Sequence, residues 1–206
     1  GQEGRAAAQQ HLLRRQSLAD LGRDLVTDIG ELPDRFRFNA ALDMRMDQDS
    51  KLTAADVLNT YDAAELQRVF GEYGEVRNAR TLANAIVGAR TVVPINTTAD
   101  LLAIADPLSM GNVNRYMAQV FQALRIEVNK EMEVLEAFLQ DAAACLKPGG
   151  RLVVMSYHSL EDRLVKSLMI KGKFQGEVEK DFYGNLLRPL EPVSRGAITA
   201  SEEELA

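Results

Sequence analysis

The stretch LKPGGRLVVMSYHSLED, residues 146–162, decides the fold class of this 206-residue chain. Gly149 and Gly150 end the helical pattern before them, because glycine suits the left-handed cap of a helix. Residues 151–156 then form a continuous apolar run, which is typical of a strand buried on both faces. The acidic residues that follow suit the first turn of a helix over 159–169. Helix, turn, buried strand and helix predict the late half of a doubly wound α/β unit.

Upstream of this stretch, apolar residues recur at helical spacing. Residues 114–146 repeat them at steps of three and four, which predicts one long helix. The stripes of residues 62–90 predict two helices separated near Gly71 and Gly74. A hydroxyl N-cap at Thr97 or Thr98 favours a short helix over 99–104. Residues 50–58 are expected to open this helical region.

The two ends of the chain carry weaker patterns. Residues 6–21 predict a helix with a polar face, and residues 25–29 predict a short buried strand that contains Asp28 near its end. Residues 32–47 have no clear period and are expected to form a loop. The turn-rich residues 174–200 favour a C-terminal β-hairpin or an extended arm. We therefore expect an α/β domain built from 1–47 and 119–206, with a helical insertion domain over 48–118.

Composition limits the classes of protein that this chain can represent. Hydrophobic residues make up 46% of it and charged residues 26%, as in ordinary globular proteins. It has no apolar run of the roughly 20 residues that a membrane helix needs, and no signal peptide is visible. The single cysteine, Cys145, excludes an internal disulfide and a cysteine-built zinc site, which fits a reducing cytoplasm.

The net charge of −6 argues against a protein that covers nucleic acid with a broad basic surface. An enzyme that acts on one flipped base needs only a local basic track, however. Two groups of arginines lie close together in the sequence and are candidates for such a track: Arg35, Arg37 and Arg45, and then Arg77, Arg80 and Arg90.

Ser156, His158 and Ser159 stand where the predicted strand gives way to the next helix. Ligands of open α/β sheets bind outside the carboxyl ends of the strands, so these three side chains are candidates for chemistry. A structural interpretation competes with this one, in which Ser159 is an N-cap and His158 is a packed loop residue. Position and composition alone favour the structural interpretation.

Gln122, Arg125 and Asn129 fall at steps of three and four and therefore share one face of the predicted long helix. Such a stripe could contact a phosphate or the edge of a base. The solvated face of an amphipathic helix explains it equally simply and is the commoner case. For residues 41–47, where two methionines alternate with charged residues, an ordinary surface loop is the default. Asp28 could orient a substrate amine or serve as a structural cap, and the residues do not separate the two.

In combination these segments resemble one family, the bacterial RsmH/MraW methyltransferases. The two most specific blocks are VFQALRIEVN, residues 120–129, and SYHSLEDRLVK, residues 156–166. The other similar segments are LDMRMD (42–47), YGE (73–75), Ala79–Arg80, Ala85–Val87, Thr97–Thr98, LKPGGR (146–151), DFYGN (181–185) and SEEE (201–204).

The resemblance implies a Rossmann-like methyltransferase domain with a helical insertion that helps to hold RNA. It implies methylation of the exocyclic amine, N4, of a cytosine in the decoding region of 16S ribosomal RNA, with S-adenosyl-L-methionine as the donor. The expected partner is 16S ribosomal RNA or the small ribosomal subunit in the cytoplasm, without membrane or metal. Whether the protein acts as a monomer or a homodimer stays open.

The resemblance also suggests roles for the candidate residues. Asp28 would bind the donor or orient the amine, so that it counts as both catalytic and cofactor-binding. Ser156 and His158 would join it as catalytic residues at the target base. The expected substrate-binding residues are Asp43 and Arg45 at the pocket mouth, Gln122, Arg125 and Asn129 on the facing wall, and Ser159.

The chain departs from the family at its start. The glycine-rich loop that holds the methyl donor has no counterpart at Gly1–Gly4, and the Gly-Phe-Ser stretch is absent between Gly30 and Phe38. We expect segments of the natural protein to be missing at these points, which breaks in the Cα trace would reveal. The alternative is a non-catalytic RNA-binding module on a degenerate methyltransferase fold. A methyltransferase for another amine, such as that of DNA adenine, is a third and weaker option.

Overall fold

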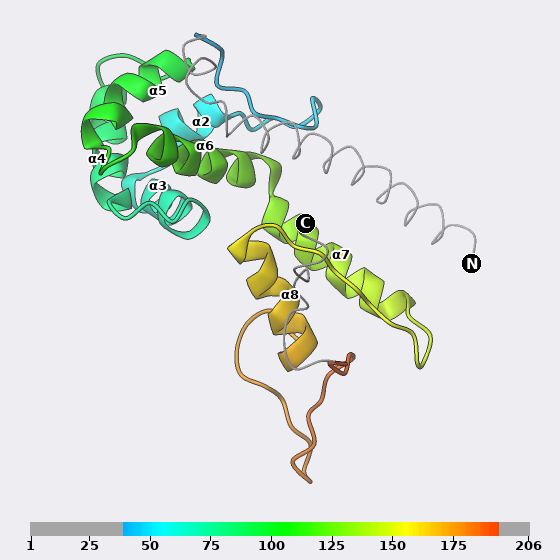
Figure 1. The fold of residues 1–206 in the computed structure, drawn as a ribbon. Coiled ribbons are helices and arrows are strands. Elements are labelled where there is room, and N and C mark those ends of the chain that lie inside the picture. Colours follow the sequence, from blue (N-terminus) through cyan, green and yellow to red (C-terminus); the bar gives the residue numbers. More distant parts are fainter. Residues whose placement is uncertain (1–38, 194–206) are drawn as a thin grey trace, which may run out of the picture. The chain divides into compact units, whose positions relative to one another are not determined.

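The computed structural model describes residues 39–193, which Figure 1 draws in colour. The chain divides into two compact units, and the boundary between them falls after Asn129 in the sequence. The predicted helix over 6–21, the predicted strand over 25–29 with Asp28, and the expected chain breaks near the start all lie outside the described residues.

The first unit is helical. In chain order it contains α2 (Ala54–Thr60), α3 (Ala63–Arg68), the π-helical turn η2 (Val69–Tyr73), α4 (Ala79–Arg90), α5 (Thr98–Ala105), the 3-10 turn η3 (Asp106–Leu108) and α6 (Val113–Asn129). These elements confirm the helical region that the sequence predicted over 50–104. Of the two glycines expected at the break, Gly71 lies inside η2, and only Gly74 falls between η2 and α4.

Capping boxes fix where three of these helices begin. Thr53 caps α2 by accepting a hydrogen bond from the backbone of Asp56, whose side chain accepts one from the backbone of Thr53 in return. The same exchange joins Asp62 to Glu65 at α3 and Thr97 to Asp100 at α5. Such boxes satisfy backbone N–H groups that a helix start would otherwise leave unpaired. The predicted hydroxyl cap is therefore Thr97.

The core of the first unit lies where α3, η2, α4 and α6 pack together. Leu66, Phe70, Leu82, Ile86 and Leu124 are all fully buried in it. They come from the stripes that the sequence placed at helical spacing, so the predicted core faces are confirmed. Burying a side chain of this size stabilises the fold by about 1.5–3 kcal/mol.

Gly74 allows η2 to approach α6 closely. A Cβ atom at this position would lie 2.6 Å from the carbonyl oxygen of Gln119 and 3.0 Å from that of Phe70. Backbone atoms cannot yield as a flexible side chain can, so any side chain here would push the two elements apart. The glycine is thus required by packing, although its φ of −100° suits any residue.

The prediction of one long helix over 114–146 is wrong. The chain forms α6, which ends at Asn129, and α7 (Glu131–Cys145), with Lys130 between them at a left-handed φ of 49°. The apolar spacing continues across this residue, so periodicity alone could not show the break. The side chain of Asn129 is bonded to a distant loop, as described below, and this contact accompanies the end of α6.

The second unit contains α7 and α8 (Ser159–Lys171), which pack through Leu135, Leu139, Val165 and Leu168. Helix α8 begins where the sequence predicted and extends two residues further. After it, an antiparallel bridge between Lys180 and Leu186 closes a tight turn. The expected C-terminal hairpin is confirmed to this extent within the described residues.

The prediction of a strand buried on both faces over 151–156 is wrong in the described structure. The segment has no regular secondary structure, and its burial alternates: Leu152 and Val154 are half-buried, whereas Val153 is 88% exposed. It has no ladder, because the only strand pairings among residues 39–193 are two isolated bridges, Ala41 with Thr97 and Lys180 with Leu186. Without neighbouring strands the side chains of Val153 and Met155 stay exposed.

The predicted insertion domain over 48–118 stays a prediction about domain organisation. Helix α6 runs unbroken across position 118, and both of its halves pack into the core of the first unit through Met117 and Leu124. Among the residues that the structure describes, no helix has the length and apolar character needed to cross a membrane.

Candidate functional site

The loop before α2 carries two of the predicted site residues and is anchored at several points. The Leu42 side chain is buried, and its N–H donates to the carbonyl of Asn96 at 2.9 Å. The carbonyls of Leu42 and Asp43 accept hydrogen bonds from the N–H groups of Ala55 and Ala54 at 2.8 and 2.9 Å. The loop therefore supplies acceptors to the first turn of α2, which fixes Asp43 against that helix.

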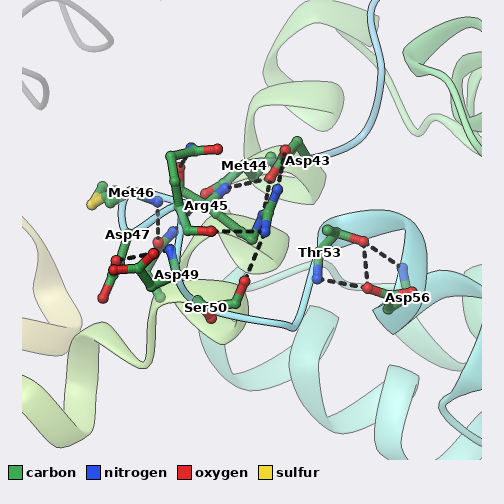
Figure 2. A network of polar contacts seen from close by, with 11 residues as sticks. Asp43, Met44, Arg45, Met46, Asp47, Asp49, Ser50, Thr53 and Asp56 are labelled. Atoms are coloured by element: carbon green, nitrogen blue, oxygen red, sulfur yellow. Dashed lines mark hydrogen bonds and ion pairs between the residues drawn. The ribbon is translucent and has the colours of Figure 1, made fainter.

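Asp43 and Arg45 form a bidentate ion pair at the centre of this loop (Figure 2). The Arg45 Nε donates to Asp43 Oδ1 at 2.6 Å, and the second guanidinium nitrogen donates to Oδ2 at 2.9 Å. The remaining nitrogen donates to the carbonyls of Gln48 and Ser50 at 3.2 and 2.7 Å. All three nitrogens of Arg45 are thus used within the loop.

The ion pair changes the acidity of both partners. The hydrogen bond from Arg45, aided by its charge, lowers the pKa of Asp43 to about 2. The same hydrogen bond raises the pKa of Arg45 above its already high usual value. Asp43 is therefore a carboxylate at neutral pH, and its side chain is 42% exposed, so it can still accept a hydrogen bond from outside the loop.

Asn129 ties the end of α6 to the same loop. Its Oδ1 accepts from the N–H of Met46 at 2.7 Å, and its Nδ2 donates to the carbonyl of Met44 at 2.8 Å. The Nδ2 also donates to the carbonyl of Arg125, one turn earlier on α6, at 2.8 Å. The amide thus binds the backbone on both sides of Arg45. Met44 takes a left-handed φ of 61°, which turns the loop at this point.

Gln122 lies about two turns before Asn129 on α6 and also binds backbone of its own unit. Its Nε2 donates to the carbonyl of Tyr73, the last residue of η2, at 2.9 Å. Gln122, Arg125 and Asn129 are all half-buried on one helix. They share one face of α6, as predicted, but the hydrogen bonds of Gln122 and Asn129 show that this face also helps to hold the fold.

The sequence analysis missed Glu127, which joins three elements of the first unit. Its carboxylate accepts from the Tyr61 hydroxyl at 2.9 Å and from the Arg68 guanidinium at 3.1 and 3.0 Å. Arg68 also lies over the ring of Tyr73, 5.4 Å from its centroid. No sequence signal could have revealed this cluster, because Glu127 is separated from Tyr61 by 66 positions and from Arg68 by 59.

The cluster shifts the acidity of its members. Burial and the hydrogen bond to Glu127 raise the pKa of Tyr61 to about 12. For Arg68, partial burial opposes the charge, but hydrogen bonds to Tyr73 and Glu127 outweigh it and raise the pKa. At neutral pH the Tyr61 phenol therefore stays protonated and Arg68 stays a guanidinium, and both are bonded to Glu127.

In the second unit, His158 is the N-cap of α8. Its Nδ1 accepts from the N–H of Leu160 at 3.2 Å, and Glu161 and Asp162 occupy the first turn, as expected. The structural alternative that made Ser159 the cap is therefore wrong, since Ser159 is the first helical residue. It is exposed and lines a shallow surface hollow of about 360 Å³ along α8. Ser156 is half-buried in the segment before α8.

The structure thus brings together part of the predicted site. Asp43, Arg45 and Asn129 meet at one loop, and Gln122 and Arg125 continue the same face of α6 in the first unit. Ser156, His158 and Ser159 lie together in the second unit. Asp28 lies outside the described residues. Within 39–193, no group of three or more acidic, histidine or cysteine side chains is placed to hold a metal ion.

Comparison with known proteins shows which family this chain resembles. A family model described as the MraW methylase family matches residues 18–206. Three relatives, each called Ribosomal RNA small subunit methyltransferase H, are similar to this chain. The protein of Amoebophilus asiaticus is 52% identical over 170 residues, which cover 82% of this chain and 55% of that protein. Those of Phocaeicola vulgatus and Bacteroides thetaiotaomicron are 50% and 49% identical over 190 residues, which cover 91% of this chain and 62% of each relative.

The chain spans between 55% and 62% of the length of these relatives. The family match extends over nine tenths of the chain and includes the second unit, all but the first 17 residues of the first unit, and every candidate site residue. The chain therefore belongs to the MraW methylase family.

Proposed function

We propose that this chain belongs to an enzyme that transfers a methyl group from S-adenosyl-L-methionine to the exocyclic N4 amine of a cytosine in the decoding region of 16S ribosomal RNA. The family match over residues 18–206 is the observation that carries the proposal. The relatives support it, because their shared name specifies methylation of small-subunit ribosomal RNA. The cytoplasm, where ribosomes are assembled, is the proposed place of action.

We further propose that residues 151–156 form the last strand of a Rossmann-like sheet in the complete protein. Their alternating burial has the period of two that a strand shows, although the described residues offer no pairing strand. A helix precedes the segment and another follows it, as in a doubly wound fold. The exposed row with Val153 and Met155 is the surface that neighbouring strands and helices would cover.

On this proposal, the loop of Asp43 and Arg45 lies at the mouth of the base pocket. A carboxylate whose pKa is about 2 is a weak base. Asp43 would therefore orient an N–H group of the cytosine by accepting its hydrogen bond, rather than act as a base that removes its proton. Arg45 holds that carboxylate in place, and Asn129 holds the loop, so both are positioning residues. Gln122, which bonds to the last residue of η2, would also be a positioning residue. Arg125, which lies between Gln122 and Asn129 on α6, is the candidate for contact with RNA.

His158 would act as a donor. A neutral imidazole whose Nδ1 accepts a hydrogen bond carries its proton on Nε2. We propose that this Nε2–H contacts the target base or the adjacent backbone, with Ser156 and Ser159 beside it. S-adenosyl-L-methionine supplies an activated methyl group when bound, and Asp28 is the proposed residue for binding this donor or for orienting the amine. The base must leave its stack to reach such a site.

The test is methylation of small ribosomal subunits by the complete protein, followed by mass spectrometry of the 16S ribosomal RNA. We expect a methyl group on one decoding-region cytosine, and its absence from the RNA of a deletion strain. Asp28→Ala and His158→Ala should each reduce the modification. An intact modification in the deletion strain would overturn the proposal. RNA binding without transfer would favour the non-catalytic module, and transfer to DNA adenine would favour the third option.

A further inference from the structure

We propose that the outer face of α4 is a track for the phosphate backbone of the RNA substrate. The proposal rests on the proposed function and names a surface for it. Its first support is the charge pattern: no acidic residue occurs from Arg77 to Ala99, although the whole chain has a net charge of −6. The stretch contains three arginines, Arg77, Arg80 and Arg90, and thus a local charge of +3.

The structure separates the two faces of α4. Ala79, Leu82, Ala83 and Ile86 are buried against the core of the first unit. The exposed positions are cationic, neutral and hydrogen-bonding, or without a side chain. Within α4 they are Arg80, Thr81, Asn84 and Gly88. Arg77 is exposed two residues before the helix, and Thr91 is exposed directly after it.

The third arginine of the stretch is excluded from the track. Arg90 donates to the carbonyl of Leu58 at 2.7 Å and is half-buried, so it holds α4 against α2. Arg115 is a further exposed cation of the first unit, in the first turn of α6. Asn78 donates to the carbonyl of Leu108 at 2.9 Å, which draws η3 to the start of α4.

Charge complementarity makes a nucleic-acid backbone the fitting occupant. Exposed arginines bind phosphate oxygens, and the hydroxyl of Thr81 and the amide of Asn84 add neutral donors between them. Gly88 adds no side chain to this face, and the space beside it is open, since a Cβ atom there would have no neighbour within 4 Å. Asp100, the first acidic residue beyond the stretch, accepts from the backbone of Asn96 and Thr97 and so is engaged in its own capping box.

The test compares two double variants of the complete protein that each remove two positive charges. Arg77→Gln/Arg80→Gln alters the track, and Lys147→Gln/Arg151→Gln alters exposed cations of the second unit as a matched control. Fluorescence anisotropy measures the binding of a labelled decoding-region RNA over a series of salt concentrations. Melting temperatures of both variants should equal that of the unsubstituted protein, because all four side chains are exposed.

We expect the track variant to bind RNA about tenfold more weakly at low salt. The slope of log Kd against log salt should fall by about 1.4, which is two phosphate contacts at roughly 0.7 each for single-stranded RNA. Equal slopes and affinities for the two variants would overturn the track, and a protein partner on this face would give that result. Methylation by the unsubstituted protein is measured in parallel. Its absence would defeat the proposed function, whereas normal methylation with an unaltered slope in the track variant would defeat only this inference.

Discussion

The side chain of Asn129 donates to the carbonyl of Met44 at 2.8 Å, although 85 positions separate the two residues in the sequence. The same amide accepts from the N–H of Met46, so it spans the loop residue Arg45 on both sides. One side chain at the end of α6 therefore determines the path of the loop that presents Asp43. The conformation of this loop depends on the first unit being folded.

Asn129→Ala should destabilise the first unit by about 2 kcal/mol, because the half-buried backbone groups of Met44 and Met46 lose their partner. Urea unfolding followed by circular dichroism measures the change. Asn114→Ala, at an exposed position in the first turn of the same helix, is the control and should change the stability by less than about 0.5 kcal/mol. Equal effects of the two substitutions would contradict the role of Asn129.

Two glycines of the first unit should respond to alanine in opposite directions. Gly74→Ala should destabilise the protein by about 1–3 kcal/mol, because its Cβ would lie 2.6 Å from the Gln119 carbonyl oxygen. Gly88→Ala should stabilise it by up to about 1 kcal/mol, because alanine favours the helix and the site is open. Thermal unfolding of both variants checks the pair, and a melting temperature that rises with Gly74→Ala would refute the packing argument.

Asp43 should titrate at about pH 2, because the Arg45 hydrogen bond lowers its pKa. A lowered pKa means that the ion pair contributes stability above the unfolded value near 4, and that this contribution disappears as the pH falls through 2. NMR titration of the Asp43 carboxyl carbon measures the midpoint. Arg45→Gln should move the midpoint up toward the usual range of aspartate, while the midpoint of Asp181, which bonds to Asn185, stays low. An unchanged titration midpoint of Asp43 in this variant would exclude Arg45 as the cause of the lowered pKa.

Tyr61 should ionise near pH 12, because burial and the hydrogen bond to Glu127 favour its neutral form. With the folded pKa raised, its contribution to stability is present below the unfolded value near 10 and is lost as the pH rises toward 12. Glu127→Gln should lower the pKa of Tyr61 by removing the negative charge. NMR of ring-labelled tyrosine follows each residue separately, and Glu133→Gln, exposed on α7, is the control that should leave Tyr61 unchanged.

His158 has both a structural and a proposed chemical role, and two substitutions separate them. His158→Ala removes the N-cap of α8 and should cost about 1 kcal/mol of stability. His158→Asn keeps a capping acceptor and should preserve stability. Since asparagine cannot reproduce the imidazole Nε2–H, we expect methylation to fall in both variants. Full methylation by His158→Asn would reduce the role of His158 to that of a cap.

The helices of the first unit could be predicted because their signals are local. Leu66 and Phe70 lie one turn apart on one face, and Thr97 with Asp100 forms a capping box that the sequence shows directly. The end of α6 had no such signal. Lys130 adopts a left-handed φ without being glycine, and the bond from Asn129 to the loop is a tertiary contact that periodicity does not record.

The burial predicted for residues 151–156 was wrong for a different reason. The apolar content of this segment predicts burial, but burial of a strand depends on neighbours elsewhere in the chain, and the described residues provide none. The candidate site shows the same limit. The family resemblance placed Asp43, Arg45 and Asn129 near a pocket, yet only coordinates show that Arg45 is fully used in holding Asp43.

The tight turn after α8 has a practical consequence for spectroscopy. Asp181 holds it by accepting from the backbone of Tyr183 and Asn185, and Phe182 and Tyr183 meet edge to face at its tip with 97% and 85% of their surfaces exposed. The sequence contains no tryptophan. Phe182→Trp would therefore introduce a single indole. The wavelength of its emission maximum reports whether water or another surface contacts this tip.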